Sequence, residues 1–351
     1  MKYSRRKFIA LAASSVATPA LVGISRARAQ APVTLKLHHY LPPSSNLHAK
    51  LYVPWAEKLS ADSGGRLKVD IFPAMQLGGT LPQLYDQARQ GVVDMVSIVP
   101  GATPGRFPAT EVIELPFVPA RRGIVNAQAC QEFAEKHLGN TFADVKLLSF
   151  WAHDQGVIHS NRPVTSMKDM KGLRLRSPSR LTGEALTALG ATPIGMPIPQ
   201  IPEALAQRTL DGAVVPWEPV PSLRINELVS NHTSIDGSPT LYVVSLGLVM
   251  NQDSFNRLPD DLKAILERNS GMTFARRAGQ MWDDAATQLI KSVGASGRNK
   301  LLLISGDEKA RWMEATAGVL PKWVAGMKSR GVDGDELVSA MRKLVAKYDA
   351  N

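Results

Sequence analysis

Cysteine is almost absent from this sequence: the 351 residues contain one, Cys130. A single cysteine excludes an intramolecular disulfide and a metal cluster held by several thiolates. Cys130 lies in the helix-like segment NAQACQEFAEKH, where it is most simply a small buried apolar residue. A chain of this length can bury a sizeable core without disulfides, so their absence is compatible with an oxidising compartment.

The sequence also lacks the short motifs that mark common catalytic sites. It contains no GxSxG, no HExxH, no Walker loop and no GxGxxG after a predicted strand. The adjacent pair His38 and His39 would point to opposite faces of a strand, so at most one of them could face a given site. The other histidines share no ligand spacing. We therefore expect no metal site, no cofactor and no enzymatic activity.

Acidic residues are missing from the first 30 residues, which carry six lysines and arginines. Arg5 and Arg6 precede an uncharged stretch, residues 8–23, that is shorter than a membrane span, and Ala27-Arg28-Ala29 is a small-x-small cleavage pattern. These features predict a cleaved export signal over residues 1–29. The twin arginine in SRRKFIA favours the twin-arginine (Tat) route, and a Sec signal with two adjacent arginines is the alternative.

Removal of this signal changes the inferred charge of the protein. The full chain carries a net charge of +10, and the loss of six basic residues leaves +4 on the mature chain. A nucleic-acid partner, which the charge of the full chain would favour, loses most of its support. No later segment of the sequence is long and apolar enough to span a membrane, so we expect a soluble protein in the periplasm.

Two stretches of the mature chain are built alike. One covers residues 33–101 and the other residues 171–217, and each reads strand, helix, strand, helix, strand. Asp94 and Asp211 open the two third strands. This alternation predicts an α/β protein with a parallel-type sheet in each of two lobes, and it places a ligand outside the carboxyl ends of the strands.

Segments outside the two repeats indicate how the lobes are completed. We expect a strand at LLSFWA to lead into the second lobe and a strand at YVVSLGLVMNQDSF to return to the first. Apolar residues at helical spacing from Pro259 to Val293 predict one long helix that braces both lobes. The expected domains are lobe I at residues 30–153, completed by about 243–280, and lobe II at residues 154–242, completed by C-terminal helices over about 281–351.

The end of one predicted strand suits a small anion. In GLRLRSPS, Arg174 and Arg176 share one face of the strand, and Arg176 lies beside its end. A guanidinium matches a carboxylate with two hydrogen bonds, and such charge-assisted bonds are worth roughly 1.5–3 kcal/mol when they are desolvated. The residues alone leave open whether Arg176 faces a cleft or is a surface arginine paired with a nearby acid.

Several of these segments together resemble the solute-receptor subunit of tripartite ATP-independent periplasmic (TRAP) transporters, the DctP-like family. The resemblance covers about residues 33–345 and is carried by MKDMKGLRLRSPS, LTALGATPIGMPIPQIPEALAQRTLDGAVVPWE, FPAMQLGG, YDQARQGVVDM and GRFPATEVIELPF. It implies a two-lobed periplasmic solute-binding fold with a ligand cleft between the lobes. It also implies a receptor, monomeric or occasionally dimeric, that closes around a small organic acid and hands it to the TRAP membrane permease.

The resemblance further implies which residues bind the ligand. The arginine of the family's KGLxxR segment pairs with the ligand carboxylate, and here that position is Arg176. Sialic-acid-type members carry a GxR segment and an Asn after the DG, whereas this chain reads QGVIHSNRP and DGAVVPWE, so a sialic-acid ligand is not expected. The other candidate ligand contacts are Trp217, Arg106, His39, Tyr40, Met196, Gln155 and Glu218.

Some of these expectations have alternatives that the sequence leaves open. Trp217 could stack on a ligand or be a core residue at the lobe boundary. Arg106 could contact a second carboxylate or brace the GRFP loop through Glu111 or Glu114, and Glu218 could contribute to a cation site beside the ligand. The ligand could be a dicarboxylate, a hydroxy or keto acid, or an aromatic acid. A Tat-exported periplasmic enzyme or a ligand sensor on the same fold is the alternative function.

Overall fold

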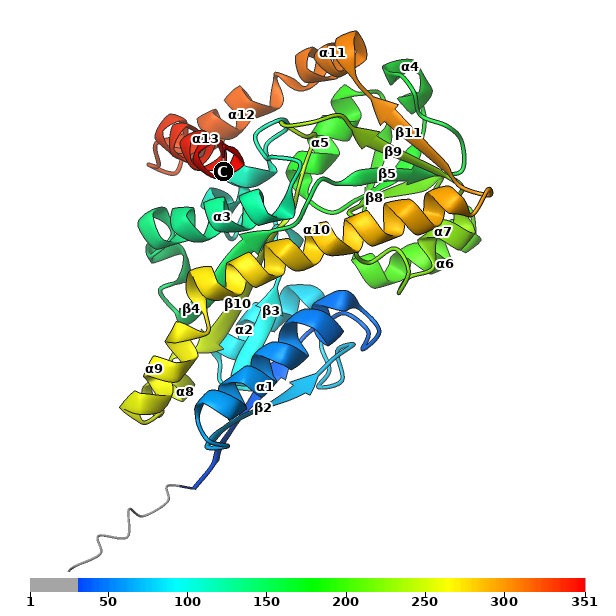
Figure 1. Ribbon diagram of the computed structural model, residues 1–351. Coiled ribbons are helices and arrows are strands. Elements are labelled where there is room, and N and C mark those ends of the chain that lie inside the picture. The colour runs from blue at the N-terminus through cyan, green and yellow to red at the C-terminus, as the bar shows by residue number, and fades with distance from the viewer. Residues whose placement is uncertain (1–30, 351) are drawn as a thin grey trace, which may run out of the picture. The chain divides into compact units, whose positions relative to one another are not determined.

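The computed structural model describes residues 31–350. The predicted export signal, residues 1–29, lies outside them. The described chain contains two separate β-sheets flanked by helices, as Figure 1 shows. This is the α/β class that the alternation of strands and helices predicts. None of the helices in this part of the chain is long and apolar enough to cross a membrane.

The first sheet has five strands in the order β2-β1-β3-β10-β4. β1 pairs in parallel with β2 and β3, whereas β10 runs antiparallel to β3 and β4. The predicted return of the YVVSLGLVMNQDSF strand to the first lobe is therefore confirmed. The strands of this sheet are β1 (Val33–His38), β2 (Leu67–Phe72), β3 (Met95–Ile98), β4 (Val145–Ala152) and β10 (Ser245–Asn251).

The second sheet has six strands in the order β11-β9-β5-β8-β6-β7. β6 pairs in parallel with β7 and β8, and β9 pairs in parallel with β11. β5 lies between β8 and β9 and runs antiparallel to both. The strands are β5 (Val157–Ser160), β6 (Arg174–Ser177), β7 (Thr192–Gly195), β8 (Gly212–Val215), β9 (Asn231–Ile235) and β11 (Lys300–Ile304).

The two sheets share a repeated unit, as the sequence predicts. The order β2-β1-β3 in the first sheet matches β7-β6-β8 in the second. The acids that open the third strands have the same role: Asp94 Oδ2 accepts from the backbone N–H of Lys36 at 2.8 Å, and Asp211 Oδ2 accepts from that of Arg174 at 2.9 Å. The carboxyl ends of the parallel strands in each unit therefore form an equivalent edge.

Short helical segments connect the strands. Around the first sheet they are η1 (Leu47–Tyr52), α1 (Val53–Asp62), η2 (Leu81–Gln83), α2 (Leu84–Arg89), η3 (Pro100–Ala102), η4 (Pro108–Glu114), α3 (Gly123–His137), η5 (Asn140–Phe142) and α8 (Gln252–Asn256). Around the second sheet they are α4 (Met167–Met170), α5 (Arg180–Ala188), η6 (Ile198–Gln200), α6 (Ile201–Ala206) and α7 (Ile225–Leu228). Ser179 caps α5 by accepting from the N–H of Thr182, so this helix begins directly after β6.

The long helix predicted from Pro259 to Val293 is two helices, α9 (Asp260–Arg268) and α10 (Gly271–Ala295). Ser270 between them is extended, with φ −106° and ψ −159°, and Gly271 has a positive φ of 55°. These backbone angles interrupt the helix, so the prediction of one continuous helix was wrong. α10 packs on α3 and β4 of the first sheet and also contacts β11 of the second, along its course in Figure 1.

The last three helices are α11 (Gly306–Thr316), α12 (Val319–Lys328) and α13 (Gly334–Asp349). α11 contacts α4 and α5 beside the second sheet, whereas α13 packs on α3. The sequence assigns all of residues 281–351 to the second lobe, and α13 departs from that assignment. The reason is its apolar stripe, which includes Leu337, Met341 and Leu344 and is buried in the core of the first sheet.

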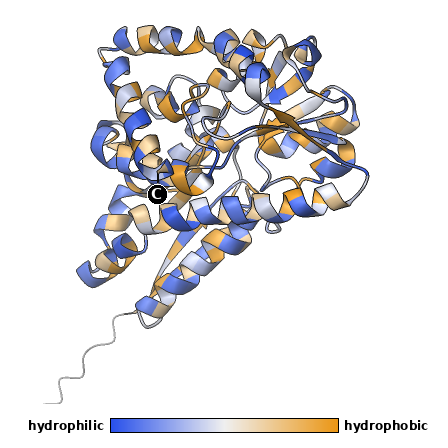
Figure 2. Ribbon diagram, turned by 45° about the horizontal axis from the view of Figure 1, so that its top comes forward, coloured by the Kyte–Doolittle hydropathy of each residue, from blue (hydrophilic) through white to orange (hydrophobic). Residues whose placement is uncertain are grey.

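The second sheet packs between two apolar cores, and its strands β5 and β8 contribute alternate side chains to both of them. On β8, Val214 belongs to one cluster, whereas Ala213 and Val215 belong to the other. The strands of this sheet are coloured hydrophobic over much of their length in Figure 2. Strand β8, which reads GAVV, is therefore buried on both faces. For this reason all four of its residues are apolar, instead of alternating with polar ones.

Candidate functional site

The main cavity lies at the strand ends of the two sheets and measures about 940 Å³. Residues that follow β1 and β3 line it on one side, and residues at the ends of β6, β7 and β8 line it on another. β10, α10 and α12 supply further wall residues. Its lining includes Tyr40, Val99, Gly101, His153, Arg176, Ser177, Gly195, Met196, Pro216, Glu218, Tyr242, Val244, Leu246, Trp282 and Val319.

Arg176 is the third residue of β6 and points into this cavity from the second sheet. Its Nε donates to the carbonyl of Met196 at 3.0 Å, and its Nη1 donates to the carbonyl of Val214 at 3.2 Å. These carbonyls belong to the chain beside β7 and to β8, the two neighbours of β6, so the sheet itself orients the guanidinium. A guanidinium has five N–H donors, and Nη2 makes no hydrogen bond within residues 31–350.

The charge of Arg176 is buried without a counter-ion. The residue is 6 % exposed, and no acidic side chain within the described residues forms an ion pair with it. Burial lowers the pKa of its guanidinium to about 10, and the nearby phenols of Tyr242 and Tyr40 act in the opposite direction. An unpaired buried cation is costly unless a negative group joins it. The cavity therefore offers a prepared site for an anion.

Arg174 differs from Arg176 in every respect that matters for binding. Its side chain is 44 % exposed and forms a two-pronged ion pair with Asp211, with distances of 3.0 and 2.9 Å from its Nε and Nη2. It also donates to the carbonyl of Arg208 at 2.9 Å. Its charge is satisfied on the surface, at the opposite end of β6 from the cavity.

Aromatic side chains form much of the wall beside Arg176. Tyr40, Tyr242 and Trp282 line the cavity, and each is almost fully buried. The Tyr242 hydroxyl and the Trp282 Nε1 are buried and have no hydrogen-bond partner among the described residues. A flat ligand between these rings could receive both apolar contact and hydrogen bonds.

His153 completes this wall as a neutral imidazole. Its Nε2 accepts from the backbone N–H of Val244 at 2.9 Å, and its Nδ1 donates to the backbone carbonyl of Asp154. Burial lowers the pKa of His153 to about 4, and the Arg176 charge lowers it further against the effect of the Asp154 carbonyl. His153 therefore brings no second positive charge to the cavity near neutral pH.

Glu218 lies on the cavity wall just after β8 and is 1 % exposed. Its Oε1 accepts from the backbone N–H of Leu47, the first residue of η1, at 2.9 Å. Its Oε2 is buried and has no partner within residues 31–350. Burial raises the pKa of this carboxyl to about 7, although the backbone N–H groups of Leu47 and Asn46 act in the opposite direction.

Trp217 and Arg106 are two of the four sequence candidates that do not line the cavity. Trp217 is in the core, where its ring lies 5.1 Å from that of His159 and 5.2 Å from that of His232. It alternates with Pro216 and Glu218, which both face the cavity, so its side chain points to the opposite side. Arg106 forms a two-pronged ion pair with Asp86 at 2.8 and 2.7 Å, so Asp86, rather than Glu111 or Glu114, braces its loop.

The remaining candidates divide in the same way. Tyr40 and Met196 line the cavity, and Met196 also presents the carbonyl that holds Arg176. His39 is buried behind the wall and hydrogen-bonds His48 at 2.9 Å. Gln155 is buried, and its amide lies beside the Ile235 carbonyl and the Arg121 guanidinium. The sequence candidates that meet at the cavity are thus Arg176, Tyr40, Met196 and Glu218.

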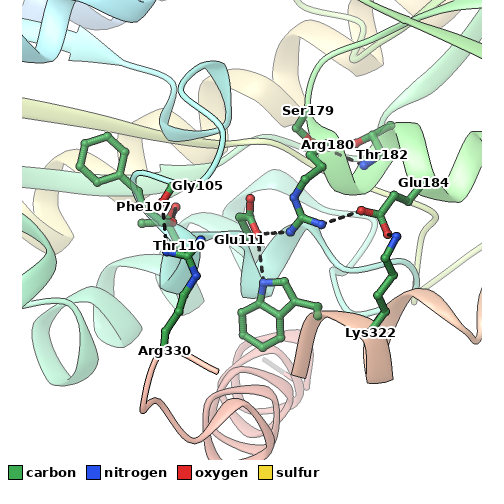
Figure 3. Close-up of polar contacts among 11 residues, drawn as sticks. Gly105, Phe107, Thr110, Glu111, Ser179, Arg180, Thr182, Glu184, Lys322 and Arg330 are labelled. Carbon is green, nitrogen blue, oxygen red and sulfur yellow. Dashed lines mark hydrogen bonds and ion pairs between the residues drawn. The ribbon is translucent and has the colours of Figure 1, made fainter. Parts of the chain in front are cut away.

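An ion-pair network forms the rim of the cavity (Figure 3). Arg180, the first residue of α5, pairs with Glu111 of η4 and with Glu184, each at 2.6 Å. Lys322 of α12 pairs with Glu184 at 3.1 Å, and Trp323 Nε1 donates to Glu111 at 3.1 Å. Arg180 also lines a smaller neighbouring cavity of about 440 Å³. Its charge is balanced by two carboxylates, in contrast to that of Arg176.

No group of three or more His, Cys, Asp or Glu side chains that could hold a metal ion exists within the described part of the chain. The site therefore consists of one unpaired buried cation, one buried carboxyl with a free oxygen, and aromatic and aliphatic walls. This arrangement can bind a small carboxylate whose remainder is largely apolar.

Comparisons with known proteins relate most of the chain to solute-binding proteins. The family model described as bacterial extracellular solute-binding protein, family 7 (DctP), matches residues 37–326. Among curated proteins, the outer membrane transporter protein TsaT of Comamonas testosteroni is 26 % identical over 319 residues, which cover 89 % of this chain and 92 % of that protein.

Two solved structures are more similar to the chain in sequence. A marine metagenome TRAP solute-binding protein, described as specific for aromatic acid ligands and crystallised with 3-hydroxybenzoate, is 40 % identical, with a TM-score of 0.88 over 91 % of this chain and 99 % of that one. A TRAP solute-binding protein from Rhodoferax ferrireducens with copurified benzoate is 38 % identical, with a TM-score of 0.87 over 91 % of this chain and 99 % of that one.

Proposed function

The chain belongs to family 7 of the bacterial extracellular solute-binding proteins, and from this membership we propose that it captures a small aromatic acid and delivers it to a TRAP membrane permease. The observation that carries the proposal is Arg176, a buried guanidinium without a counter-ion that faces an apolar cavity. A ligand carboxylate would supply the missing negative charge. The function is thus reversible binding, and the cavity residues position a solute rather than transform it.

The walls of the cavity support an aromatic ligand over a dicarboxylate. Tyr40, Tyr242 and Trp282 present rings beside Arg176. The other arginine at the cavity, Arg180, is already paired with Glu111 and Glu184, so it offers no free charge for a second carboxylate. The two similar structures described above carry 3-hydroxybenzoate and benzoate, which fit the same pattern of one carboxylate on a flat apolar ring.

Binding is proposed to couple to closure of the two lobes. The cavity is lined from both sheets, so a ligand that touches Arg176 of β6 and Tyr40 after β1 gains its full set of contacts only when the strand ends approach. The favourable free energy of those contacts shifts the receptor toward its closed state. The closed, loaded form is the state that a permease would recognise.

A titration with matched acids tests the proposed ligand class. We expect benzoate and hydroxybenzoates to raise the melting temperature of the purified protein and to bind with measurable heat, whereas succinate and acetate do neither. Saturation at 100 times the dissociation constant would add about 2.7 kcal/mol to the unfolding free energy. Stabilisation by succinate alone would contradict the aromatic assignment, and mass spectrometry of the small molecule released on denaturation would then name the class.

A further inference from the structure

Glu218 Oε2 is a buried polar atom that has no hydrogen-bond partner among the described residues. In contrast, Oε1 of the same carboxyl is held by the Leu47 N–H. Buried carboxyl oxygens are normally hydrogen-bonded, and leaving one unpaired costs about 1–3 kcal/mol or more. Because Glu218 lines the main cavity, a donor can reach Oε2 from that side.

The position of Glu218 relative to Arg176 makes it a second polar contact for the same ligand. Both side chains line the cavity, and both act on the phenol of Tyr40. Burial raises the pKa of Tyr40, the Glu218 charge raises it further, and the Arg176 charge opposes the rise. No ion pair or hydrogen bond joins Glu218 to Arg176 among the described residues. Both groups therefore remain available to a ligand in the cavity.

A bound cation is a weaker explanation for the free oxygen. A divalent ion normally takes several oxygen ligands, and Glu218 belongs to no group of three potential ligands in the described chain. Its carboxyl is also already fixed by a backbone donor, which leaves one oxygen to be satisfied. One hydrogen-bond donor is sufficient for that oxygen.

We propose that Glu218 is a specificity-determining residue that selects aromatic acids carrying a hydroxyl group on the ring. The inference rests on the proposed function, because it assumes that the ligand carboxylate is bound at Arg176. The ring then lies along Tyr40, and its hydroxyl donates to Glu218 Oε2. An unsubstituted ring leaves Oε2 unpaired and is bound less tightly for that reason.

The ligands themselves provide a test on the unmodified protein. Calorimetry would compare benzoate, 3-hydroxybenzoate and 4-hydroxybenzoate with 3-methoxybenzoate and 4-methoxybenzoate, in which the oxygen is kept and the donor is lost. At pH 8, where Glu218 is ionised, we expect one hydroxy acid to bind about ten-fold or more tightly than its methoxy partner and than benzoate, as a hydrogen bond to a charged group requires. Equal affinity for all five acids would overturn the proposal while the aromatic-acid function stands. Binding of none of them would overturn both.

The variant Glu218→Gln provides the second test. In this variant the amide oxygen can still accept from the Leu47 N–H, as Oε1 does now. The amide NH₂ then takes the place of Oε2, so a hydrogen-bond donor stands where the free acceptor was. We expect the hydroxy-over-methoxy preference to fall to within about three-fold or to reverse, while benzoate affinity changes much less. Glu203→Gln, an exposed glutamate on α6, is the control and should keep the preference. A full preference retained in Glu218→Gln would overturn the proposal.

Discussion

Arg180 Nη2 lies 2.6 Å from Glu111 Oε2, and this ion pair joins α5 beside the second sheet to η4, whose residues Val112 and Ile113 are buried in the core of the first. Trp323 donates to the same carboxylate oxygen. A second contact of this kind links Glu218, after β8, to the N–H of Leu47 at the start of η1. Both contacts lie at the cavity, and each joins an element beside one sheet to an element beside the other through a side chain.

Removal of the Arg180–Glu111 pair should weaken the connection between these elements. The Glu111 side chain is 9 % exposed and that of Arg180 is 39 % exposed, so solvent screens the pair only in part. We expect a double-mutant cycle of Arg180→Gln and Glu111→Gln, measured by urea unfolding, to give a coupling free energy of about 1 kcal/mol. The exposed pair Arg224 and Glu227 is the matched control and should give no measurable coupling. Equal coupling free energies at the two pairs would contradict the view that the Arg180–Glu111 pair holds α5 to η4.

Arg176→Ala should abolish the rise in melting temperature that an aromatic acid produces. The guanidinium is the only unpaired cation among the described residues of the cavity wall, because Arg180 and Lys322 are paired with glutamates. Without ligand, the variant should lose little stability, since it removes a buried charge that has no counter-ion.

Arg174→Ala, two residues away on the same strand, is the control for that experiment. Its side chain pairs with Asp211 on the surface, and its loss should leave the ligand-induced shift unchanged. The measurement is a thermal melt with and without saturating 3-hydroxybenzoate. The assignment of Arg176 fails if its alanine variant is stabilised as strongly as the parent protein.

The repeated units were predictable because local patterns encode them. Each strand of the repeats is a short run of alternating or β-branched residues that ends in Pro, Ser or Gly. Three strands were not predicted. β9 reads NHTSI, and its polar residues His232 and Thr233 are buried through partners elsewhere in the chain, namely His159 and the Val164 carbonyl. Such pairing is tertiary and leaves no periodic signal in the strand itself.

The candidate site was predictable where it comes from strand ends. Arg176 lies near the end of β6, and Tyr40, Met196 and Glu218 follow other strands of the repeats, whose ends meet at one edge. His153, Tyr242 and Trp282 were missed because they come from the segment after β4, the segment before β10 and the helix α10, all outside the repeats. Trp217 was a candidate because it follows a strand of the second repeat, and the alternative that it is a core residue is the one that the structure favours, since Pro216 and Glu218 on either side of it line the cavity.

Glu114 should make stability depend on pH. It is buried, its Oε1 accepts from the Ser245 N–H and hydroxyl, and burial raises its pKa from 4.5 to about 7. The folded state therefore keeps a proton that the unfolded chain releases above pH 4.5. The resulting stability is complete below that pH and is lost as the pH rises through 7.

Glu114→Gln cannot ionise, so the melting temperature of the variant minus that of the parent should rise from pH 5 to about pH 7 and then level off by pH 8. Titrations of the buried histidines, which are common to both proteins, cancel in this difference. Glu314→Gln on the exposed face of α11 is the control and should give a flat difference. A flat line for Glu114→Gln would show that the buried carboxyl does not gain a proton on folding.

The proposed export route predicts where the protein accumulates when the twin arginine is changed. Arg5 and Arg6 lie outside the described residues, so the argument is from sequence alone. The double substitution Arg5→Lys and Arg6→Lys keeps the positive charge but removes the arginine pair that the Tat route requires. We expect the unprocessed chain to remain in the cytoplasm on cell fractionation. Continued export of a shortened chain would indicate the Sec route instead.

Gly156 should be intolerant of a side chain because it lies directly against a wall residue of the cavity. A Cβ placed on Gly156 would overlap the ring of Tyr242, and the Gly156 N–H donates to the Tyr242 carbonyl at 3.1 Å. Tyr242 is 1 % exposed, so its ring has little room to retreat from the added methyl group. We expect Gly156→Ala to cost about 1–3 kcal/mol of unfolding free energy and to weaken ligand binding, because the displaced ring moves toward the ligand.

Gly195→Ala is the matched control, since Gly195 also lines the cavity and nothing lies within 4 Å of the added Cβ. The measurements are urea unfolding and calorimetric titration with 3-hydroxybenzoate for both variants. The Gly195 variant should retain its stability, so loss confined to Gly156→Ala would assign the effect to Tyr242. Trimming the ring with Tyr242→Leu in the Gly156→Ala background should then recover part of the lost stability, because the overlapping atoms are removed. If the double variant is as unstable as the sum of the two single variants, the contact between Gly156 and Tyr242 is not the cause.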